Sequence, residues 1–241
     1  MDKMRLKLKF ACNQLKLPIS YQSILQGFIY HIFDQKDYGS FLHDEGYRLN
    51  HKVFKMFTFS NLIGPYKLGD KTITYEKEVS LQIASQSEEF MQYIYQFFIT
   101  NERIILNHQT LTLQNIELID PPYFKGERDI LLKTISPVVA YKSKDQYVHY
   151  FKPSDQEFEN LCLTNLEEKN LAINEPISEI IFSINKINYE KKRIVRFKNT
   201  FYVAYLTEIN IHTNYETLNL IYSTGLSAKG SAGFGMIEAR L

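Results

Sequence analysis

Histidine is the residue type in this chain best suited to moving protons near neutral pH, because the pKa of imidazole lies close to 7. The chain has six histidines: His31, His43, His51, His108, His149 and His212. His43 is the first candidate for a general acid or base because it lies in a short polar segment, 42–46, just after a predicted helix. An exposed loop histidine is its ordinary alternative. His31 fits the end of that helix, where the dipole favours it. We expect the others to be structural or exposed, with a catalytic role for His51 as an alternative.

Four further polar residues near His43 in the sequence could assist such chemistry. Lys52 and then Lys55 follow it within one loop and strand, so both ammonium groups could approach the same phosphate. Tyr30 and Tyr47 compete as hydroxyl donors. Each has a common alternative, which is a solvated lysine or a core aromatic residue with its hydroxyl group at the surface. The candidate catalytic set is therefore His43, Lys52, Tyr30 and Tyr47.

Glycines are concentrated near the C-terminal end. Four of the ten fall in residues 225–241: Gly225, Gly230, Gly233 and Gly235. Glycine is the costliest residue to order, so such a cluster indicates a backbone that must pass very close to something. Successive N–H groups in a turn bind anions, and Lys229 adds a cation beside Ser231. A flexible tail or an ordinary hairpin turn is the alternative.

The familiar nucleotide-binding loops do not fit this run. A nucleoside-triphosphate loop has Lys and Ser or Thr directly after its second glycine and leads into a helix, whereas Lys229 precedes Gly230. The dinucleotide fingerprint has a different glycine order and opens a βαβ unit. The run therefore predicts another kind of polyanion contact.

A second cationic feature is residues 189–198, which carry five basic residues and one acid. This local charge of +4 contrasts with a net charge of +1 for the chain. The five are Lys191, Lys192, Arg193, Arg196 and Lys198. They predict a phosphate-tracking strand that contributes affinity and salt dependence but no sequence selectivity. The alternative is a solvated edge strand protected by its charges. We expect the segment to turn, because Lys191, Arg193 and Arg196 cannot share one strand face without a bulge.

Composition indicates a globular protein of one large or two small domains, with 44% hydrophobic and 23% charged residues. No carboxylate pair or His/Cys set has metal-ligand spacing, so we expect neither a metal nor another cofactor. Cys12 and Cys162 suggest buried free thiols and a reducing cytoplasm. No stretch approaches the ~20 apolar residues of a membrane span, and the N-terminus lacks the apolar core of a signal peptide.

The first half predicts the order βα, a strand pair, α, β. Residues 3–10 alternate between basic and apolar positions, as in a half-buried strand. A helix should follow with Ser20 as its cap. We expect strands at 54–60, 73–75 and 78–84, a helix at 88–99 and a strand at 110–119.

After a break at 120–122 the pattern begins again. Strands are predicted at 130–141, with Pro137 at an edge or bulge, and at 179–187, 191–197, 201–211 and 236–241. Helices are predicted at 155–172 and 214–222. Each half approximates βαββαβ, so the prediction is an α+β protein with two tandem ferredoxin-like domains, 1–122 and 128–241, and a C-terminal glycine-rich loop.

Four features occur together along this chain: the glycine-rich run after two such halves, segment 41–47 after the first helix, strand 55–62 and segment 135–139. In these features the chain resembles the CRISPR repeat-processing endoribonucleases of the RAMP superfamily. The four features span nearly the whole chain in the family's order. One departure is Ser227, which stands where the family loop commonly has its second glycine.

The resemblance implies cleavage of CRISPR precursor RNA within its repeats, without metal. The products would carry a 5′-hydroxyl and a 2′,3′-cyclic phosphate. It places the catalytic histidine at His43. It also implies that the glycine loop contacts the RNA backbone, through Gly225, Lys229, Gly230, Ser231, Gly233 and Gly235. Attack by the ribose 2′-hydroxyl is intramolecular, so positioning and proton transfer suffice.

Two alternatives stay open. Relatives with the same folds are non-catalytic RNA-holding subunits of CRISPR effector complexes, and an unrelated small-molecule enzyme could share the fold. The expected partners are CRISPR repeat RNA and, as further candidates, other effector subunits, with no membrane. We expect a monomer or homodimer.

Overall fold

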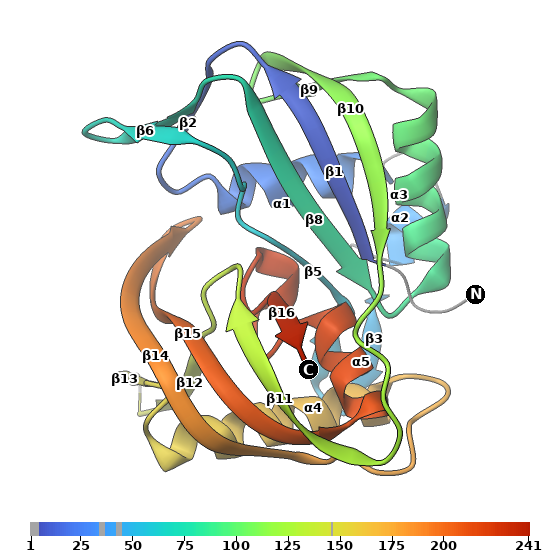
Figure 1. Cartoon of the computed structure of the whole chain (residues 1–241), viewed down its shortest axis with the longest axis vertical. Coiled ribbons are helices and arrows are strands. Elements are labelled where there is room, and N and C mark those ends of the chain that lie inside the picture. Colours follow the sequence, from blue (N-terminus) through green and yellow to red (C-terminus); the bar gives the residue numbers. More distant parts are fainter. Residues whose placement is uncertain (1–4, 34–36, 42–44, 146) are drawn as a thin grey trace.

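The computed structural model describes residues 5–33, 37–41, 45–145 and 147–241. It is a mixed α+β protein whose main sheets are antiparallel, as predicted. Figure 1 shows two halves stacked along the long axis, the first in blue to green and the second in yellow-green to red.

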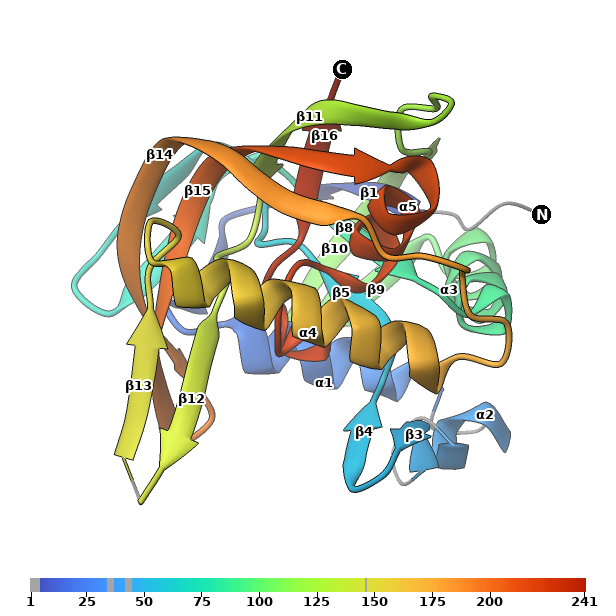
Figure 2. The ribbon, with the colours of Figure 1, turned by 90° about the horizontal axis from the view of Figure 1, so that it is seen from below.

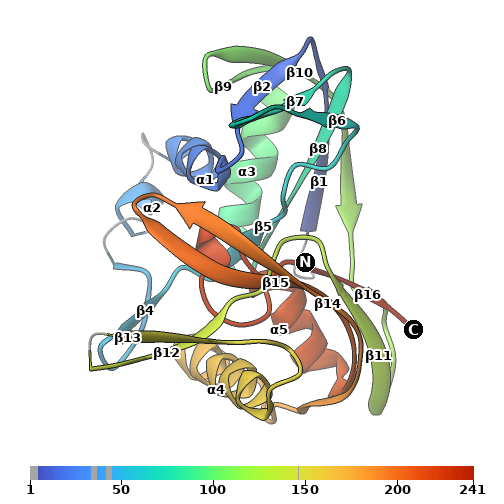
Figure 3. The ribbon, with the colours of Figure 1, turned by 90° about the vertical axis from the view of Figure 1, so that its left-hand side faces the viewer.

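The first half is built on a sheet with the strand order β5-β8-β1-β10-β9. Its strands are β1 (Arg5–Cys12), β5 (Phe57–Phe59), β8 (Glu78–Ser85), β9 (Arg103–Leu106) and β10 (Gln109–Ile119). Helices α1 (Gln22–His31) and α3 (Glu88–Thr100) cover one face (Figure 3). The predicted alternation in β1 is confirmed for the apolar positions, since Leu6, Leu8 and Phe10 are buried. It was wrong for Arg5, which was predicted with the basic positions and is also buried. On the opposite face, Lys7 pairs with Glu117 and Lys9 with Glu78.

The second half repeats this arrangement with the strand order β14-β15-β11-β16. Its strands are β11 (Glu127–Thr134), β14 (Phe182–Phe197), β15 (Thr200–Asn214) and β16 (Ile237–Arg240), and its helices are α4 (Gln156–Ala172) and α5 (Tyr215–Thr224). Both halves run β-α-β-β-α-β, and in both the first strand lies between the third and the last. Each half has its own apolar core.

Smaller elements decorate this frame. β2 (Leu15–Pro18), β6 (Tyr66–Leu68) and β7 (Thr72–Tyr75) form a three-stranded sheet. The hairpins β3 (Tyr47–Leu49)–β4 (Lys52–Phe54) and β12 (Ala140–Lys144)–β13 (Tyr147–Phe151) project in the same direction (Figure 2). α2 (Asp37–Ser40) precedes β3.

Several predicted boundaries were wrong in the first half. The N-cap of α1 is Tyr21 and makes no side-chain capping bond, so Ser20 is not the cap. The strand predicted at 54–60 is divided between two elements, because Met56 takes a left-handed φ of 50° after β4. The helix at 88–99 is confirmed, and Ser87 caps it by accepting from the Phe90 amide.

Two strand predictions were wrong in the second half. The strand at 130–141 ends at Thr134, because the chain leaves the sheet around Pro137 and joins another hairpin at Ala140. The separate strands at 179–187 and 191–197 are one strand, β14. Its bulges lie between Ile184 and Lys186 and between Ile187 and Tyr189, so the basic stretch runs straight from Lys191 to Phe197 and turns only at Lys198, where φ is 53°.

A buried arginine joins the two halves. Arg5 on β1 donates from Nη1 to the Ile237 carbonyl at 2.6 Å and from Nη2 to the Tyr222 carbonyl at 2.8 Å. Its guanidinium also stacks 3.4 Å from the centre of the Tyr222 ring. Burial lowers the pKa of Arg5 to about 10, so it stays charged at neutral pH. The first strand of one half is therefore tied to α5 and β16 of the other.

Both cysteines are free thiols, with Cys162 buried and Cys12 half-buried. Among the residues that the structure describes, no helix is long and apolar enough to cross a membrane.

Candidate functional site

The glycine-rich run, residues 225–235, connects α5 to β16 and packs between the two halves. We call it the glycine loop. Most of it is buried, and Lys229 is its exposed residue. Phe234 is buried in a small cluster with Val139, Val195, Ala204 and Ala232. The Gln26 side chain of α1 donates to the Ser231 carbonyl at 2.7 Å, which fastens the loop to the first half. The loop is thus an ordered element of the interface.

Close contact explains the glycines. A Cβ atom at Gly235 would lie 2.0 Å from the Leu226 carbonyl oxygen, and φ there is +73°. At Gly230 it would lie 2.4 Å from the Thr224 carbonyl oxygen, and at Gly233 2.5 Å from the Phe59 ring. These glycines, with Gly225, therefore allow close packing against protein.

Ser227 shows how the loop accommodates a residue with a side chain. Its φ is +69°, a left-handed conformation that disfavours most side chains. The Ser227 hydroxyl donates to the Val139 carbonyl at 2.6 Å, which offsets part of that strain. The loop therefore keeps a left-handed turn at a residue that has a side chain.

The middle of the glycine loop offers free hydrogen-bond donors. The backbone amides before and after it are occupied, as when Leu226 donates to Gly235 and Gly235 to Pro137. Within the described part of the chain, the amides of residues 227–231 donate to no acceptor. Consecutive unsatisfied amides in a turn are suited to an anion.

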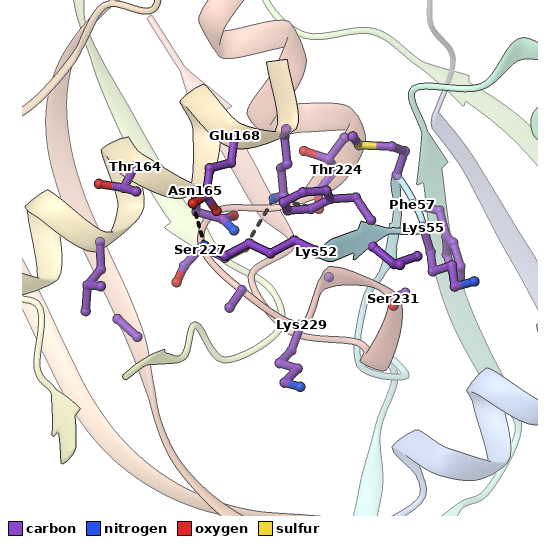
Figure 4. A pocket seen from close by; sticks show the side chains of 18 of the residues that line it. Lys52, Lys55, Phe57, Thr164, Asn165, Glu168, Thr224, Ser227, Lys229 and Ser231 are labelled. Carbon is purple, nitrogen blue, oxygen red and sulfur yellow. Dashed lines mark hydrogen bonds and ion pairs between the residues drawn. The ribbon is translucent and has the colours of Figure 1, made fainter. Parts of the chain in front are cut away.

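Residues 227–231 line a pocket of about 620 Å³ between the two halves. Figure 4 shows α4 along one side, the glycine loop along another, and Lys52, Lys55 and Phe57 entering from the first half. Tyr30 of α1 also lines it. The fold therefore brings together residues predicted separately: Tyr30, Lys52, Lys55, Lys229, Gly230 and Ser231.

Two of these residues have defined surroundings. Lys52 forms an ion pair with Glu168 on α4, and the two side chains meet across the pocket (Figure 4). Tyr30 is half-buried against Phe57, with ring centres 5.9 Å apart. Burial raises the pKa of Tyr30 to about 12, so its hydroxyl stays protonated at neutral pH.

A buried lysine forms part of the same wall. Lys169 on α4 donates to the carbonyls of Gly225 at 2.8 Å, Ser227 at 3.1 Å and Thr224 at 3.4 Å. Sequence patterns gave no prediction for Lys169 or Glu168. A signal was present for Lys169, since it follows Cys162 and Leu166 on the buried face of the predicted helix at a spacing of four and then three residues.

Other predicted catalytic residues lie elsewhere or outside the described part. His43 falls outside the described residues. Tyr47 lines a second pocket of about 540 Å³ with Tyr38 and Arg48, and its ring packs against Phe41. The structure therefore does not place Tyr47 beside Lys52 in the first pocket.

The predicted basic strand is the edge strand β14 of the second sheet. Its basic side chains are exposed or half-buried, and Arg196 lies over the Phe201 ring at 5.8 Å. None of Lys191, Lys192, Arg193, Arg196 and Lys198 lines the pocket. The strand is a separate surface.

The remaining histidines have ordinary positions. His31 ends α1, as predicted, and His51, His108 and His149 are exposed. His212 bridges Asp129 and Glu127, which raises its pKa. Within the described ranges, no group of three or more His, Cys, Asp or Glu side chains is arranged to hold a metal ion.

Comparison with known proteins places this architecture in a family. The model of the C-terminal part of the CRISPR associated protein Cas6 matches residues 119–239, half of the chain. The chain is 23% identical over 231 residues to the CRISPR-associated endoribonuclease Cas6 of Pyrococcus furiosus, across 92% of this chain and 83% of that protein.

Solved structures share the fold. A structure of a CRISPR associated protein Cas6 superposes with a TM-score of 0.79 at 20% identity, over 100% of both chains. A structure of a RAMP protein binding different RNA substrates gives 0.78 at 19% identity, over 99% of this chain and 100% of that one. The family match and the shared fold agree, and this chain belongs to the Cas6 family of CRISPR-associated RAMP proteins.

Proposed function

We propose that the protein is an endoribonuclease that cuts CRISPR precursor RNA within its repeats, without a metal ion, by attack of the ribose 2′-hydroxyl on the adjacent phosphate. The products are a 5′-hydroxyl and a 2′,3′-cyclic phosphate. The observation that carries the proposal is the pocket between the two halves, which is lined by Tyr30 and Lys52 of the first half and by residues 227–231 of the glycine loop, whose amides have no acceptor in the described structure. The Cas6 relative of Pyrococcus furiosus is an endoribonuclease, which agrees with this chemistry.

The chemistry needs three contributions. RNA carries its own nucleophile, so the pocket must hold the 2′-oxygen, phosphorus and 5′-oxygen in line. His43 moves protons as general acid or base. Lys52 stabilises the charge that develops on the phosphorane, and the protonated Tyr30 hydroxyl orients the sugar or donates to the leaving oxygen. We keep Tyr47 as the competing hydroxyl donor.

RNA backbone binding is assigned to two surfaces. Lys229 and the amides of residues 227–231 hold phosphate at the pocket, with Gly230 and Ser231 allowing close approach. The other glycines of the loop, Gly225, Gly233 and Gly235, support this conformation by packing against protein. The basic side chains of β14 contact phosphates farther along the RNA and supply salt-dependent affinity.

Lys52 must change partners in this scheme. In the structure its ammonium pairs with Glu168. A scissile phosphate in the pocket would share or replace that carboxylate, because both anions favour the same cation. Glu168 therefore holds Lys52 at the pocket until RNA arrives.

The decisive experiment incubates a labelled CRISPR repeat RNA with the protein in excess chelator, beside His43→Ala and the exposed-site control His108→Asn. Asparagine suits the left-handed φ of 62° at residue 108. We expect one cleavage site, a loss of at least 100-fold in rate for His43→Ala, and an unchanged rate for the control.

Three outcomes would redirect the proposal. Cleavage of an RNA with a 2′-deoxy sugar at the scissile nucleotide would exclude the 2′-hydroxyl mechanism. Cleavage that survives in His43→Ala would move the proton transfer to His31, His51 or a Tyr/Lys set. Binding without cleavage would favour an RNA-holding subunit.

We also assign the two halves to tandem ferredoxin-like domains, 1–122 and 128–241. The support is the shared β-α-β-β-α-β order and the shared strand order of the two sheets. The glycine loop then belongs to the second domain and completes a site whose other wall comes from the first.

A further inference from the structure

We infer that Lys169 is a positioning residue that holds the glycine loop in the conformation that faces the pocket. This inference rests on the proposed function for its link to RNA, and on the contacts of Lys169 for its link to the loop. Figure 4 shows α4, which carries Lys169, lying alongside the loop and the pocket.

The contacts match the chemistry of an ammonium group. Three carbonyls, that of Thr224 at the end of α5 and those of Gly225 and Ser227 in the loop, converge on Nζ at 2.8–3.4 Å. An ammonium has three donors and no acceptor, so each carbonyl receives one N–H. The C-terminal carbonyls of α5 and the first left-handed turn of the loop are satisfied by one side chain from another helix.

The charge is unusual because no carboxylate among the described residues neutralises it. Lys169 is 5% exposed, and the neighbouring acid on α4, Glu168, is engaged by Lys52. Cys162 is the other titratable group beside it. Burial lowers the pKa of Lys169 to about 7, which shows how strongly the site disfavours the charge. An apolar residue of the same length would avoid this cost, so Lys169 must contribute something that an apolar residue cannot.

We infer that this contribution is to orient the peptide groups of the loop. The Ser227 carbonyl, which accepts from Lys169, shares its peptide group with the Ala228 amide, so this contact turns that amide away from Nζ. The amides of residues 227–231 have no acceptor in the described structure. Residues 227–231 line the pocket, and Lys169 lines it too. The buried positive charge of Lys169 also favours an anion there.

The test compares Lys169→Met, Lys169→Arg and the control Asn170→Leu. Asn170 is the next residue of α4, is 7% exposed, and bonds the backbone of Ile177 at 2.8 and 2.9 Å. Asn170→Leu therefore removes buried hydrogen bonds from the same helix without touching the glycine loop. Any general loosening of α4 should appear in both Lys169→Met and Asn170→Leu.

Separate measurements report the conformation of the loop and the reaction with RNA. Hydrogen exchange of a peptide covering residues 225–236 reports the bonded amides of Leu226 and Gly235. Single-turnover cleavage at saturating protein reports the rate constant, and binding of a 2′-deoxy RNA reports Kd. Lys169→Met should speed exchange in this peptide and slow cleavage by about 10- to 100-fold, the scale expected of a 1 Å misplacement.

We expect Kd to change much less, because β14 supplies separate phosphate contacts. Lys169→Arg should recover at least part of the cleavage rate and of the protection, since it restores a buried cation. Asn170→Leu should leave both unchanged.

Unaltered exchange in Lys169→Met, or a wild-type cleavage rate despite faster exchange, would overturn the assignment. So would an equal loss of protection in Asn170→Leu. A wild-type protein that neither binds nor cuts RNA would overturn the proposed function alone, and the exchange comparison would still decide whether Lys169 holds the loop.

Discussion

Two buried cations do different work in this protein. Arg5 joins the halves by donating to carbonyls of α5 and β16, and its guanidinium stacks on Tyr222. Lys169 joins α4 to the glycine loop within the second half. Burial lowers the pKa of Arg5 to about 10 and that of Lys169 to about 7. A delocalised guanidinium keeps its charge in the core, whereas an ammonium is brought to the edge of deprotonation.

The difference indicates that Arg5 mainly stabilises the fold, whereas Lys169 mainly sets the conformation of the glycine loop. The arginine is a permanent cation, suited to a contact that must persist under all conditions. The lysine can lose its proton near neutral pH, so its contacts depend on conditions and concern one loop.

Removing Arg5 should have the largest effect. Arg5→Met leaves the buried carbonyls of Tyr222 and Ile237 without a donor, so we expect the free energy of unfolding to fall by about 4 kcal/mol. Urea denaturation measures it, with the exposed Arg103→Met as the matched control. A fall below about 1 kcal/mol would show that Arg5 is not the joint between the halves.

The loop that Lys169 holds can be strained directly. Gly235→Ala forces a Cβ atom against the Leu226 carbonyl at a positive φ, and should lower the free energy of unfolding by about 3 kcal/mol. Gly126 also has a positive φ but has nothing within 4 Å. Gly126→Ala should therefore cost only about 1 kcal/mol in the same denaturation assay. Equal costs would mean that backbone conformation, and not packing, explains the glycine.

The pH dependence should separate the two cations. Between about pH 7 and the ordinary lysine pKa of 10.5, the unfolded chain binds the Lys169 proton that the native state has released, so stability rises with pH. From pH 6.5 to 9, the wild type should gain about 2 kcal/mol relative to Lys169→Met. Urea denaturation at both pH values measures this gain. The stability difference between the wild type and Arg5→Met should not change over this pH range. If it did, the two buried cations would not differ in their response to pH.

The exposed cation His212 should give a small change of stability with pH, in the direction opposite to that of Lys169. His212 contacts two carboxylates, Glu127 and Asp129, which raise its pKa above the ordinary value of 6.5. Its stabilisation is present below pH 6.5 and is lost as pH rises through the raised pKa. In low salt, Tm of the wild type should exceed that of His212→Asn slightly at pH 5.5 and match it at pH 8.5. A difference that grows with pH would contradict this reading.

Local patterns predicted much of the frame. Alternation in 3–10 and helical spacing in 88–99 and 155–172 depend on neighbours in sequence, and the described part of the chain has a strand from Arg5 and both helices. The hairpin β12–β13 was missed because its strands are mostly exposed and lack an apolar alternation. β14 was divided in the prediction because two bulges interrupt its alternation, and only pairing with β15 makes it one strand.

The candidate site was predicted in pieces. Residue type and local context indicated Tyr30, Lys52 and Lys229, which line one pocket. Tyr47 lies at another, because β3 directs it toward Phe41 and Tyr38. Lys169 could not be found by its chemistry, because its ligands are backbone carbonyls about 55–58 positions away and carry no residue signature.

The contact between Arg5 and Ile237 also orders events during synthesis. The two residues are 232 positions apart in sequence, and closing so long a loop is entropically slower than forming local structure. A nascent chain can form α1, α3 and the first sheet before Arg5 has made its hydrogen bonds to the second half. The first strand completes its bonds only after residue 237 has emerged, so the joint between the halves forms late on the ribosome.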